Sequence, residues 1–215
     1  MKLFLDTANL EQIRQGVKWG ITGVTTNPTL VAAEGVSDYK KLILEICDLV
    51  PEEVSAEVTV EGVKAMAIQG RELAGWHERI VVKLPCTPDG FQVATELARD
   101  GIKVNMTLCF SASQALMAAL CGAYFVSPFI GRLDDIGQDG MSLISEITDI
   151  FGVGDLETRV LAASVRHPQH VLQAASLGAY AATIPFRVLL QLTQHPLTET
   201  GNARFLADWG KRSVV

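Results

Sequence analysis

The sequence lacks any run of about 20 consecutive apolar residues, the length that an α-helix needs to cross a bilayer. Its first apolar segment is interrupted by the acidic residue Asp6, too early for the hydrophobic part of a signal peptide. Basic residues are not in excess either, since 18 lysines and arginines face 24 acidic residues and give a formal net charge of −6. We therefore expect a cytoplasmic protein that binds neither a membrane nor nucleic acid.

Motifs for metals and cofactors are equally scarce. None of the four cysteines forms a CxxC pair, and all of them lie in apolar segments, which favours reduced thiols over a disulfide framework. His167 and His170 are spaced like a metal pair, but no carboxylate or thiol cluster accompanies them. A Gly-rich phosphate loop of the nucleotide-binding type is also missing. We expect no metal ion and no organic cofactor.

What the sequence does contain is a regular alternation of short β-rich segments with helical patterns. Eight strands are predicted, at residues 2–6, 23–27, 54–59, 80–84, 104–108, 124–129, 159–164 and 181–185. Helical patterns follow them and begin near residues 10, 37, 61, 89, 111, 140, 168 and 186. Such units predict parallel strands joined by crossover helices, and eight units close a (β/α)8 barrel, the TIM barrel. A doubly wound open sheet has the same alternation and is the alternative.

No linker divides the chain, and one further helix follows the last strand–helix unit. Because Gly-rich and Ser-rich stretches are absent, we expect a single domain over residues 1–215. The extra helix is predicted at about residues 198–211 and carries Phe205, Leu206 and Trp209. Its apolar face needs a partner, either the barrel or a neighbouring subunit.

One charged residue departs from this pattern, because Lys83 lies inside the buried-strand sequence IVVKLP. Charged side chains are rarely buried without a partner or a chemical role. A lysine loses its proton readily when it is desolvated, and the neutral amine is a nucleophile that forms Schiff bases with carbonyl compounds. The alternative is a lysine at a strand edge whose ammonium group lies in solvent.

Polar residues at the ends of the other strands favour a chemical role for this lysine. In a barrel of this kind the active site lies at the carboxyl ends of the strands. The polar residues at or near these ends are Asp6, Thr25, Thr26, Asn27, Glu57, Asn105, Thr107, Ser127, Ser164 and Arg166. Residues with i, i+2 spacing share one face of a strand, and the pairs with this spacing are Asn105/Thr107, Ser127/Phe129 and Ser164/Arg166. Packing alone does not explain so many polar groups, because buried polar groups need partners.

The sequence resembles the transaldolase family in six motifs that span essentially the whole chain. They are LDTAN, GVTTNP, VKLP, NMTL, SPFIGR and ASVR, in this order. Each motif is weak alone, but the set is specific. The likeness is to the small type, which is about as long as this chain and also includes fructose-6-phosphate aldolases.

The resemblance implies a transferase that acts on sugar phosphates without a metal or organic cofactor. It would move a dihydroxyacetone unit from sedoheptulose 7-phosphate or fructose 6-phosphate to glyceraldehyde 3-phosphate or erythrose 4-phosphate, in the pentose phosphate pathway. Lys83 is then the Schiff-base residue, and Asp6 is the base that takes the proton of the C4 hydroxyl. Glu57 and Thr107 would hold the water that shuttles protons during Schiff-base formation.

By the same resemblance, eight residues form the substrate-binding set. They are Asn27, Thr26, Asn105, Ser127, Phe129, Arg132, Ser164 and Arg166. Asn27 and Asn105 would bond the dihydroxyacetone hydroxyls, while Arg132 and Arg166, with Ser164, would clamp the phosphate. Ordinary alternatives stay open, because an asparagine before a proline suits a turn, a threonine suits a strand and an arginine suits the surface.

Two positions distinguish transfer from release within the family. Transaldolases carry Glu and Phe where the aldolases carry Gln and Tyr, and this sequence has Glu57 and Phe129. A tyrosine hydroxyl at position 129 could protonate the enamine and release free dihydroxyacetone, whereas a phenyl ring cannot. The second hypothesis is a fructose-6-phosphate aldolase that uses free dihydroxyacetone. The third is a catalytically silent protein that binds sugar phosphates.

The resemblance also implies an assembly. Small members of the family are typically decamers built from pentamer rings, in which the C-terminal helix is swapped onto a neighbour. Residues 198–211 suit that use, and we expect a homodecamer.

Cys86, three residues after Lys83, is expected to be a thiol near the site.

Overall fold

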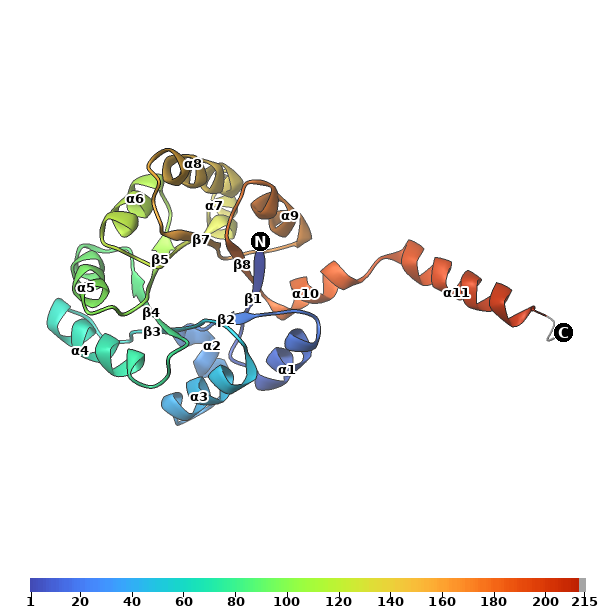
Figure 1. Ribbon diagram of the computed structural model, residues 1–215, viewed down its shortest axis with the longest axis horizontal. Coiled ribbons are helices and arrows are strands. Elements are labelled where there is room, and N and C mark those ends of the chain that lie inside the picture. The colour runs from blue at the N-terminus through green and yellow to red at the C-terminus, as the bar shows by residue number, and fades with distance from the viewer. Residues whose placement is uncertain (213–215) are drawn as a thin grey trace.

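The computed structural model describes residues 1–212, and its strands form one closed barrel of parallel neighbours (Figure 1). The strands are β1 (Lys2–Asp6), β2 (Gly23–Thr25), β3 (Val54–Glu57), β4 (Ile80–Pro85), β5 (Val104–Cys109), β6 (Phe125–Pro128), β7 (Arg159–Ala162) and β8 (Ala181–Ile184). They follow one another around the barrel in chain order, and β1 closes it by pairing with β8. The predicted (β/α)8 barrel is therefore confirmed, and the open sheet is excluded.

Helices surround the barrel and connect successive strands, except the last two, which follow β8 (Figure 1). They are α1 (Leu10–Lys18), α2 (Pro28–Ala33), α3 (Tyr39–Leu49), α4 (Val63–Ala74), α5 (Pro88–Arg99), α6 (Ala112–Leu120), α7 (Ile130–Asp135), α8 (Gly140–Val153), α9 (Pro168–Ser176), α10 (Phe186–Thr193) and α11 (Pro196–Gly210). The sequence does not predict α2 and α7, because a six-residue helix is too short to show a 3.6-residue period. No helix among residues 1–212 combines the length and the apolar character that crossing a membrane requires.

The barrel interior has an apolar layer beneath a polar one. The apolar cluster comprises Phe4, Val81, Phe125, Leu161 and Ala181. Residues two apart on a strand face the same side. On four of these strands, the residue two positions after the apolar one therefore also points into the barrel, nearer its carboxyl end. The pairs of lower and upper residues are Phe4/Asp6, Val81/Lys83, Phe125/Ser127 and Ala181/Thr183. The apolar layer therefore forms the floor of a polar site at the carboxyl ends of the strands.

The last helix, α11, projects away from the barrel (Figure 1). None of its residues is buried, and the large apolar side chains that it exposes are Leu197, Phe205, Leu206 and Trp209. The helix spans Pro196–Gly210 rather than residues 198–211, because the side chain of His195 caps it and a proline suits the first turn. Its apolar side chains are left uncovered by the barrel.

Candidate active site

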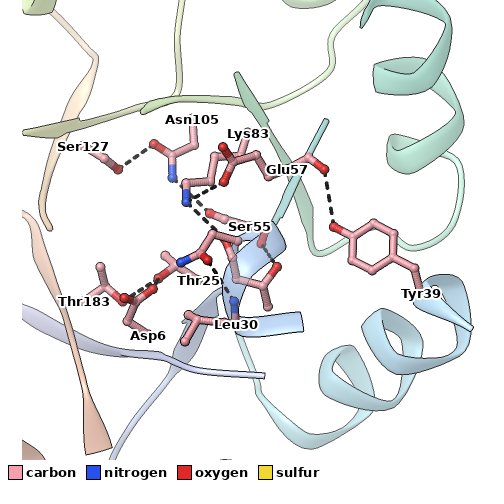
Figure 2. Close-up of polar contacts among 12 residues, drawn as sticks. Asp6, Thr25, Leu30, Tyr39, Ser55, Glu57, Lys83, Asn105, Ser127 and Thr183 are labelled. Carbon is pink, nitrogen blue, oxygen red and sulfur yellow. Dashed lines mark hydrogen bonds and ion pairs between the residues drawn. The ribbon is translucent and has the colours of Figure 1, made fainter. Parts of the chain in front are cut away.

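Lys83 is buried in the polar layer of the barrel, with 4 % of its surface exposed. Its Nζ lies 3.0 Å from Glu57 Oε2 and donates a hydrogen bond of 3.0 Å to the backbone carbonyl of Thr26 (Figure 2). The strand register explains the ion pair, because Glu57 on β3 pairs with Lys83 on β4. The solvent-exposed alternative is therefore wrong, and the lysine has a carboxylate partner that can accept its proton.

Asp6 ends β1 and is the second titratable group of the polar layer. Its Oδ1 accepts a hydrogen bond of 2.8 Å from Thr25 Oγ1, and these residues are partners in the register of β1 with β2. Burial raises the pKa of this carboxyl above its ordinary value, while the charge of Lys83 and the hydrogen bond from Thr25 oppose the rise. A carboxyl whose pKa is perturbed beside an amine is a typical acid–base pair of active sites.

A cavity of about 230 Å³ lies at the carboxyl end of the barrel. It is lined by eight of the predicted site residues, namely Asp6, Asn27, Lys83, Ser127, Phe129, Arg132, Ser164 and Arg166. The rest of the lining is Thr25, Ala163, Val165, Thr183 and Pro185. The volume lies below the range of about 300–1,000 Å³ that is usual for drug-sized ligands. The cavity therefore suits a small polar ligand.

Four predicted residues lie behind this lining, namely Thr26, Glu57, Asn105 and Thr107. Glu57 contacts Lys83 and lines a separate cavity that is formed mainly by the segments following β3 and β4. The hydroxyl of Thr26 donates 2.9 Å to the carbonyl of Ser55, so Thr26 reaches the lysine through its backbone. Thr107 Oγ1 is buried and has no hydrogen-bond partner among residues 1–212. Glu57 and Thr26 therefore contact Lys83 without lining the cavity.

Two serines hold the fully buried Asn105 in place (Figure 2). Its Nδ2 donates 3.0 Å to Ser55 Oγ, and its Oδ1 accepts 2.7 Å from Ser127 Oγ. A serine hydroxyl has a single proton. Because Ser127 gives its proton to Asn105, it can only accept a hydrogen bond from a ligand. Asn105 thus influences the cavity through Ser127.

Asn27 combines a structural role with a place in the cavity. Its Oδ1 accepts the backbone N–H of Leu30 at 3.0 Å and caps α2, whose first residue is Pro28. The turn role that the sequence leaves as an alternative is therefore present. Since Asn27 also lines the cavity, its Nδ2 amide group is placed to donate to a ligand.

The two arginines reach the cavity from the segments that follow β6 and β7. The guanidinium of Arg132 on α7 lies 5.1 Å from the centre of the Phe129 ring. Arg166 Nη2 lies 2.6 Å from Asp135 Oδ2, in an ion pair whose side chains are both exposed. Both guanidinium groups can form charge-assisted hydrogen bonds to an anion at the rim of the cavity.

The segment that carries Ser164 and Arg166 is not a strand, so the i, i+2 argument is wrong for this pair. β7 ends at Ala162, and Ser164 has a φ of 58° in the left-handed region. Phe129 likewise lies one residue beyond β6. The segment packs closely on α7, because the N–H of Gly131 donates 3.1 Å to the Ser164 carbonyl. A Cβ at Gly131 would lie 2.2 Å from that oxygen, so any other residue would push the segment away.

The histidine pair belongs to the support of Arg166. His167 caps α9 by accepting the backbone N–H of His170. His170 Nε2 lies 2.9 Å from Asp134 Oδ2, and His170 Nδ1 accepts the backbone N–H of Arg166 at 3.3 Å. Burial lowers the pKa of His170, which favours the neutral ring that this arrangement needs. Within residues 1–212, no three potential ligands are grouped to hold a metal ion.

The four cysteines are free thiols. Cys86 is buried and does not line the cavity, and its contact with Cys109 together with burial raises the pKa of its thiol. A thiol that stays protonated is a poor nucleophile. Its position and protonation therefore indicate a packed thiol near the site.

Two cavity residues have no role predicted from the sequence, namely Thr25, which is expected only as a strand-end residue, and Thr183. Threonine is common in strands, so its presence there carries little functional signal. The signal that could identify them is position, since Thr25 pairs with Asp6 in register and Thr183 lies near the carboxyl end of the last strand.

Comparison with known proteins gives matches over almost the full length. A family model described as "Transaldolase/Fructose-6-phosphate aldolase" matches residues 3–212. A "Probable transaldolase" from Dehalococcoides mccartyi is 56 % identical over 211 residues, which cover 97 % of this chain and 98 % of the relative. A protein of the same name from Roseiflexus castenholzii is 54 % identical, and the match covers 97 % of this chain and 97 % of the relative. Another, from Shouchella clausii, is also 54 % identical, and the match covers 100 % of this chain and 99 % of the relative.

Two solved structures share the barrel fold at low sequence identity. A mandelate oxidase mutant gives a TM-score of 0.58 at 15 % identity, and the match covers 83 % of this chain and 59 % of that one. A flavocytochrome b2 variant gives a TM-score of 0.60 at 14 % identity, over 86 % of this chain and 56 % of that one. At such identities the likeness concerns the barrel alone.

We predict that Asp6 titrates above the ordinary carboxyl range, because burial outweighs the charge of Lys83 and the hydrogen bond from Thr25. Carbon-13 NMR of protein labelled at its aspartate carboxyls measures the pKa, and Asp6→Asn assigns the signal. Thr25→Val should raise the pKa of Asp6 further, since it removes a hydrogen bond that favours the carboxylate. Asp139 is an internal control, because a hydrogen bond from Ser142 lowers its pKa. An Asp6 signal at the ordinary pKa in both proteins would contradict this account.

Proposed function

The chain belongs to the transaldolase/fructose-6-phosphate aldolase family, and on this basis we propose that it is a transaldolase whose Schiff-base residue is Lys83. It transfers a dihydroxyacetone unit from sedoheptulose 7-phosphate or fructose 6-phosphate to glyceraldehyde 3-phosphate or erythrose 4-phosphate. This reaction belongs to the pentose phosphate pathway of the cytoplasm and needs no metal or organic cofactor. The observation that carries the proposal is the buried amine of Lys83, paired with Glu57 at a cavity that Asp6 also lines.

Lys83 must lose a proton before it can attack a carbonyl carbon. Glu57 Oε2, 3.0 Å from Nζ, is placed to accept that proton. The neutral amine then attacks C2 of the ketose to form a carbinolamine, which loses water to give the iminium. The buried hydroxyl of Thr107 supports a water position between it and Glu57, because it has no partner among the described residues. Such a water would carry the protons of these steps.

Asp6 acts as the base of the bond-breaking step. Its carboxylate takes the proton of the C4 hydroxyl, the C3–C4 bond breaks, and the electron pair passes into the iminium to give an enamine. The first aldose phosphate leaves, and the enamine carbon attacks the aldehyde of the second. Asp6 then returns the proton to the new alkoxide oxygen, and hydrolysis of the iminium frees Lys83. The raised pKa of Asp6 supports its role as the base, because a carboxylate with a higher pKa captures a proton more readily.

The rest of the lining orients the sugar phosphate. Asn27 donates to a dihydroxyacetone hydroxyl through its amide, and Ser127 accepts from one. Arg132 and Arg166 hold the phosphate together with Ser164, which lies in the segment after β7. The covalent end and the phosphate end of the substrate are thus bound by different elements of the barrel rim.

Retention of the enamine distinguishes a transaldolase from an aldolase. Phe129 lines the cavity, and its ring is flanked by Phe110 and by the guanidinium of Arg132. A phenyl ring offers no acidic proton, so the enamine is not quenched from this side. The residue supports transfer over the alternative function, fructose-6-phosphate cleavage with release of free dihydroxyacetone.

The exposed helix α11 supports an assembly of identical chains. Four large apolar side chains on a projecting helix form a surface that needs a partner. We propose that α11 packs on a neighbouring copy in a homodecamer of pentamer rings. Light scattering of the full chain and of a chain that ends before His195 tests this proposal. The truncated chain should form smaller assemblies than the full chain. If both the full chain and the truncated chain are monomers, the proposed assembly is contradicted.

Lys83→Ala should lower kcat by more than about 10³-fold, because the other basic groups at the cavity are arginines, which do not form Schiff bases. The fold should persist, since Asp6, whose pKa burial already raises, can take up a proton when the amine is gone. Lys103→Ala is the matched control, because it removes a lysine that contacts Glu53 rather than the cavity. Steady-state assays and circular dichroism measure both effects.

Two outcomes would contradict the proposed function. Turnover that survives Lys83→Ala would exclude a Schiff base on this residue. Thermal stabilisation by fructose 6-phosphate without any turnover in the unsubstituted protein would instead indicate the silent sugar-phosphate-binding protein. Retained fold with lost turnover is the expected result.

Cleavage of fructose 6-phosphate should depend on an acceptor aldehyde. Added erythrose 4-phosphate is expected to raise the cleavage rate roughly tenfold or more, because the enamine otherwise stays on the enzyme. Phe129→Tyr should increase the release of free dihydroxyacetone without acceptor, and Phe110→Tyr, on the neighbouring ring, is the matched control. If the unsubstituted protein cleaves the hexose phosphate equally fast without acceptor, the aldolase alternative is correct.

A further inference from the structure

Two buried threonines link Asp6 to both of the strands that flank β1. Thr25 on β2 donates its hydroxyl proton to Asp6 Oδ1 over 2.8 Å, and Thr183 Oγ1 on β8 lies 2.7 Å from Thr25 Oγ1 (Figure 2). Both threonines line the cavity and are at most 3 % exposed. No step of the proposed reaction uses Thr183. Thr183 is nevertheless linked through Thr25 to the carboxylate of Asp6, the proposed base.

The direction of each hydrogen bond in this series follows from the number of protons that each hydroxyl can donate. A threonine hydroxyl carries one proton and can accept further hydrogen bonds. Because Thr25 gives its proton to Asp6, the proton in the contact between the two hydroxyls must come from Thr183. The chain therefore runs from Thr183 to Thr25 to Asp6. Each donor polarises the next, which strengthens the final bond.

We propose that Thr183 is a positioning residue for Asp6, which it holds through Thr25 in the orientation and charge state of a general base. This proposal rests on the proposed function, because it assigns a support to that same base. A hydrogen bond to a carboxylate is stronger than one to a neutral carboxyl. The hydrogen bonds from Thr183 through Thr25 therefore favour the carboxylate form of Asp6 before it captures a proton. They weaken once Asp6 is protonated, which helps Asp6 to return the proton.

The charged groups around Asp6 set the sign of the expected pH effect. Lys83 from β4 favours the carboxylate, and its partner Glu57 on β3 partly neutralises that influence. Arg132 and Arg166 line the same cavity from the segments after β6 and β7. A base must be deprotonated, so activity is lost as the pH falls through the pKa of Asp6. Loss of the Thr183 hydroxyl removes support for the carboxylate and should move that acid limb to higher pH.

The test compares Thr183→Val with Thr183→Ser. Valine keeps the shape of threonine without the hydroxyl, so kcat of Thr183→Val should fall roughly fivefold to tenfold, as for loss of one hydrogen bond. Its acid limb in kcat/KM should move to higher pH, with KM little changed. Serine keeps the hydroxyl and should restore kcat and the acid limb. Thr183→Ala repeats the test if the valine variant does not fold.

Thr158→Val is the matched control, because its buried hydroxyl donates 2.6 Å to the carbonyl of Ala123, away from the cavity. It can lower the melting temperature but should leave the acid limb in place. The adduct left by borohydride and fructose 6-phosphate separates the two proposals. Once the reaction with fructose 6-phosphate has reached equilibrium, Thr183→Val should form as much of it as the unsubstituted protein, since the substitution slows the Asp6 step but leaves Lys83 in place.

Each remaining outcome has one meaning. Unchanged kcat and acid limb in a folded Thr183→Val, with normal adduct, would overturn the role of Thr183 and leave the proposed function intact. An acid limb that moves equally in Thr158→Val would also overturn it, because the effect would then be a general loss of stability. Absence of the adduct in the unsubstituted protein would overturn both proposals.

Discussion

The ion pair between Lys83 and Glu57 is the interaction on which the rest of the site depends. Two charges are removed from water here, and such a pair is tolerated only when further polar groups complete it. The carbonyl of Thr26 supplies one of these groups for the ammonium. Removal of one partner from a buried pair costs about 3–5 kcal/mol. The chain thus retains an amine at a position where a hydrophobic residue would pack more simply.

The barrel makes this pair usable because it places an apolar floor directly beneath it. Val81 lies two residues before Lys83, and Phe4 lies two residues before Asp6, so each of these titratable side chains rises from a closely packed layer. The floor keeps water away from the lower side of the site and raises the pKa of Asp6 through burial. The same geometry brings Thr183 to Asp6, because β8 closes the barrel on β1. Charge, burial and hydrogen bonding at the site are therefore consequences of the strand register.

The sequence predicts the barrel and most of the cavity lining, because strand periodicity is local and because strand ends meet at one mouth. It does not reveal that Asn105 reaches the cavity through Ser127, since that depends on the register of two strands. Ser164 is misplaced on a strand, because its left-handed backbone depends on close packing against α7. Thr183 is missed because a threonine in a strand looks ordinary until β8 is known to lie beside β1. What escapes prediction is thus set by contacts between distant segments.

The central claim is that Lys83 holds a three-carbon fragment covalently until an aldehyde accepts it. Borohydride reduction in the presence of fructose 6-phosphate, followed by digestion and mass spectrometry, tests it most directly. The account predicts a reduced dihydroxyacetone adduct on the peptide that contains Lys83, and its loss when erythrose 4-phosphate is added before the borohydride. An unmodified Lys83 peptide, or an adduct on an exposed lysine such as Lys103, would contradict it.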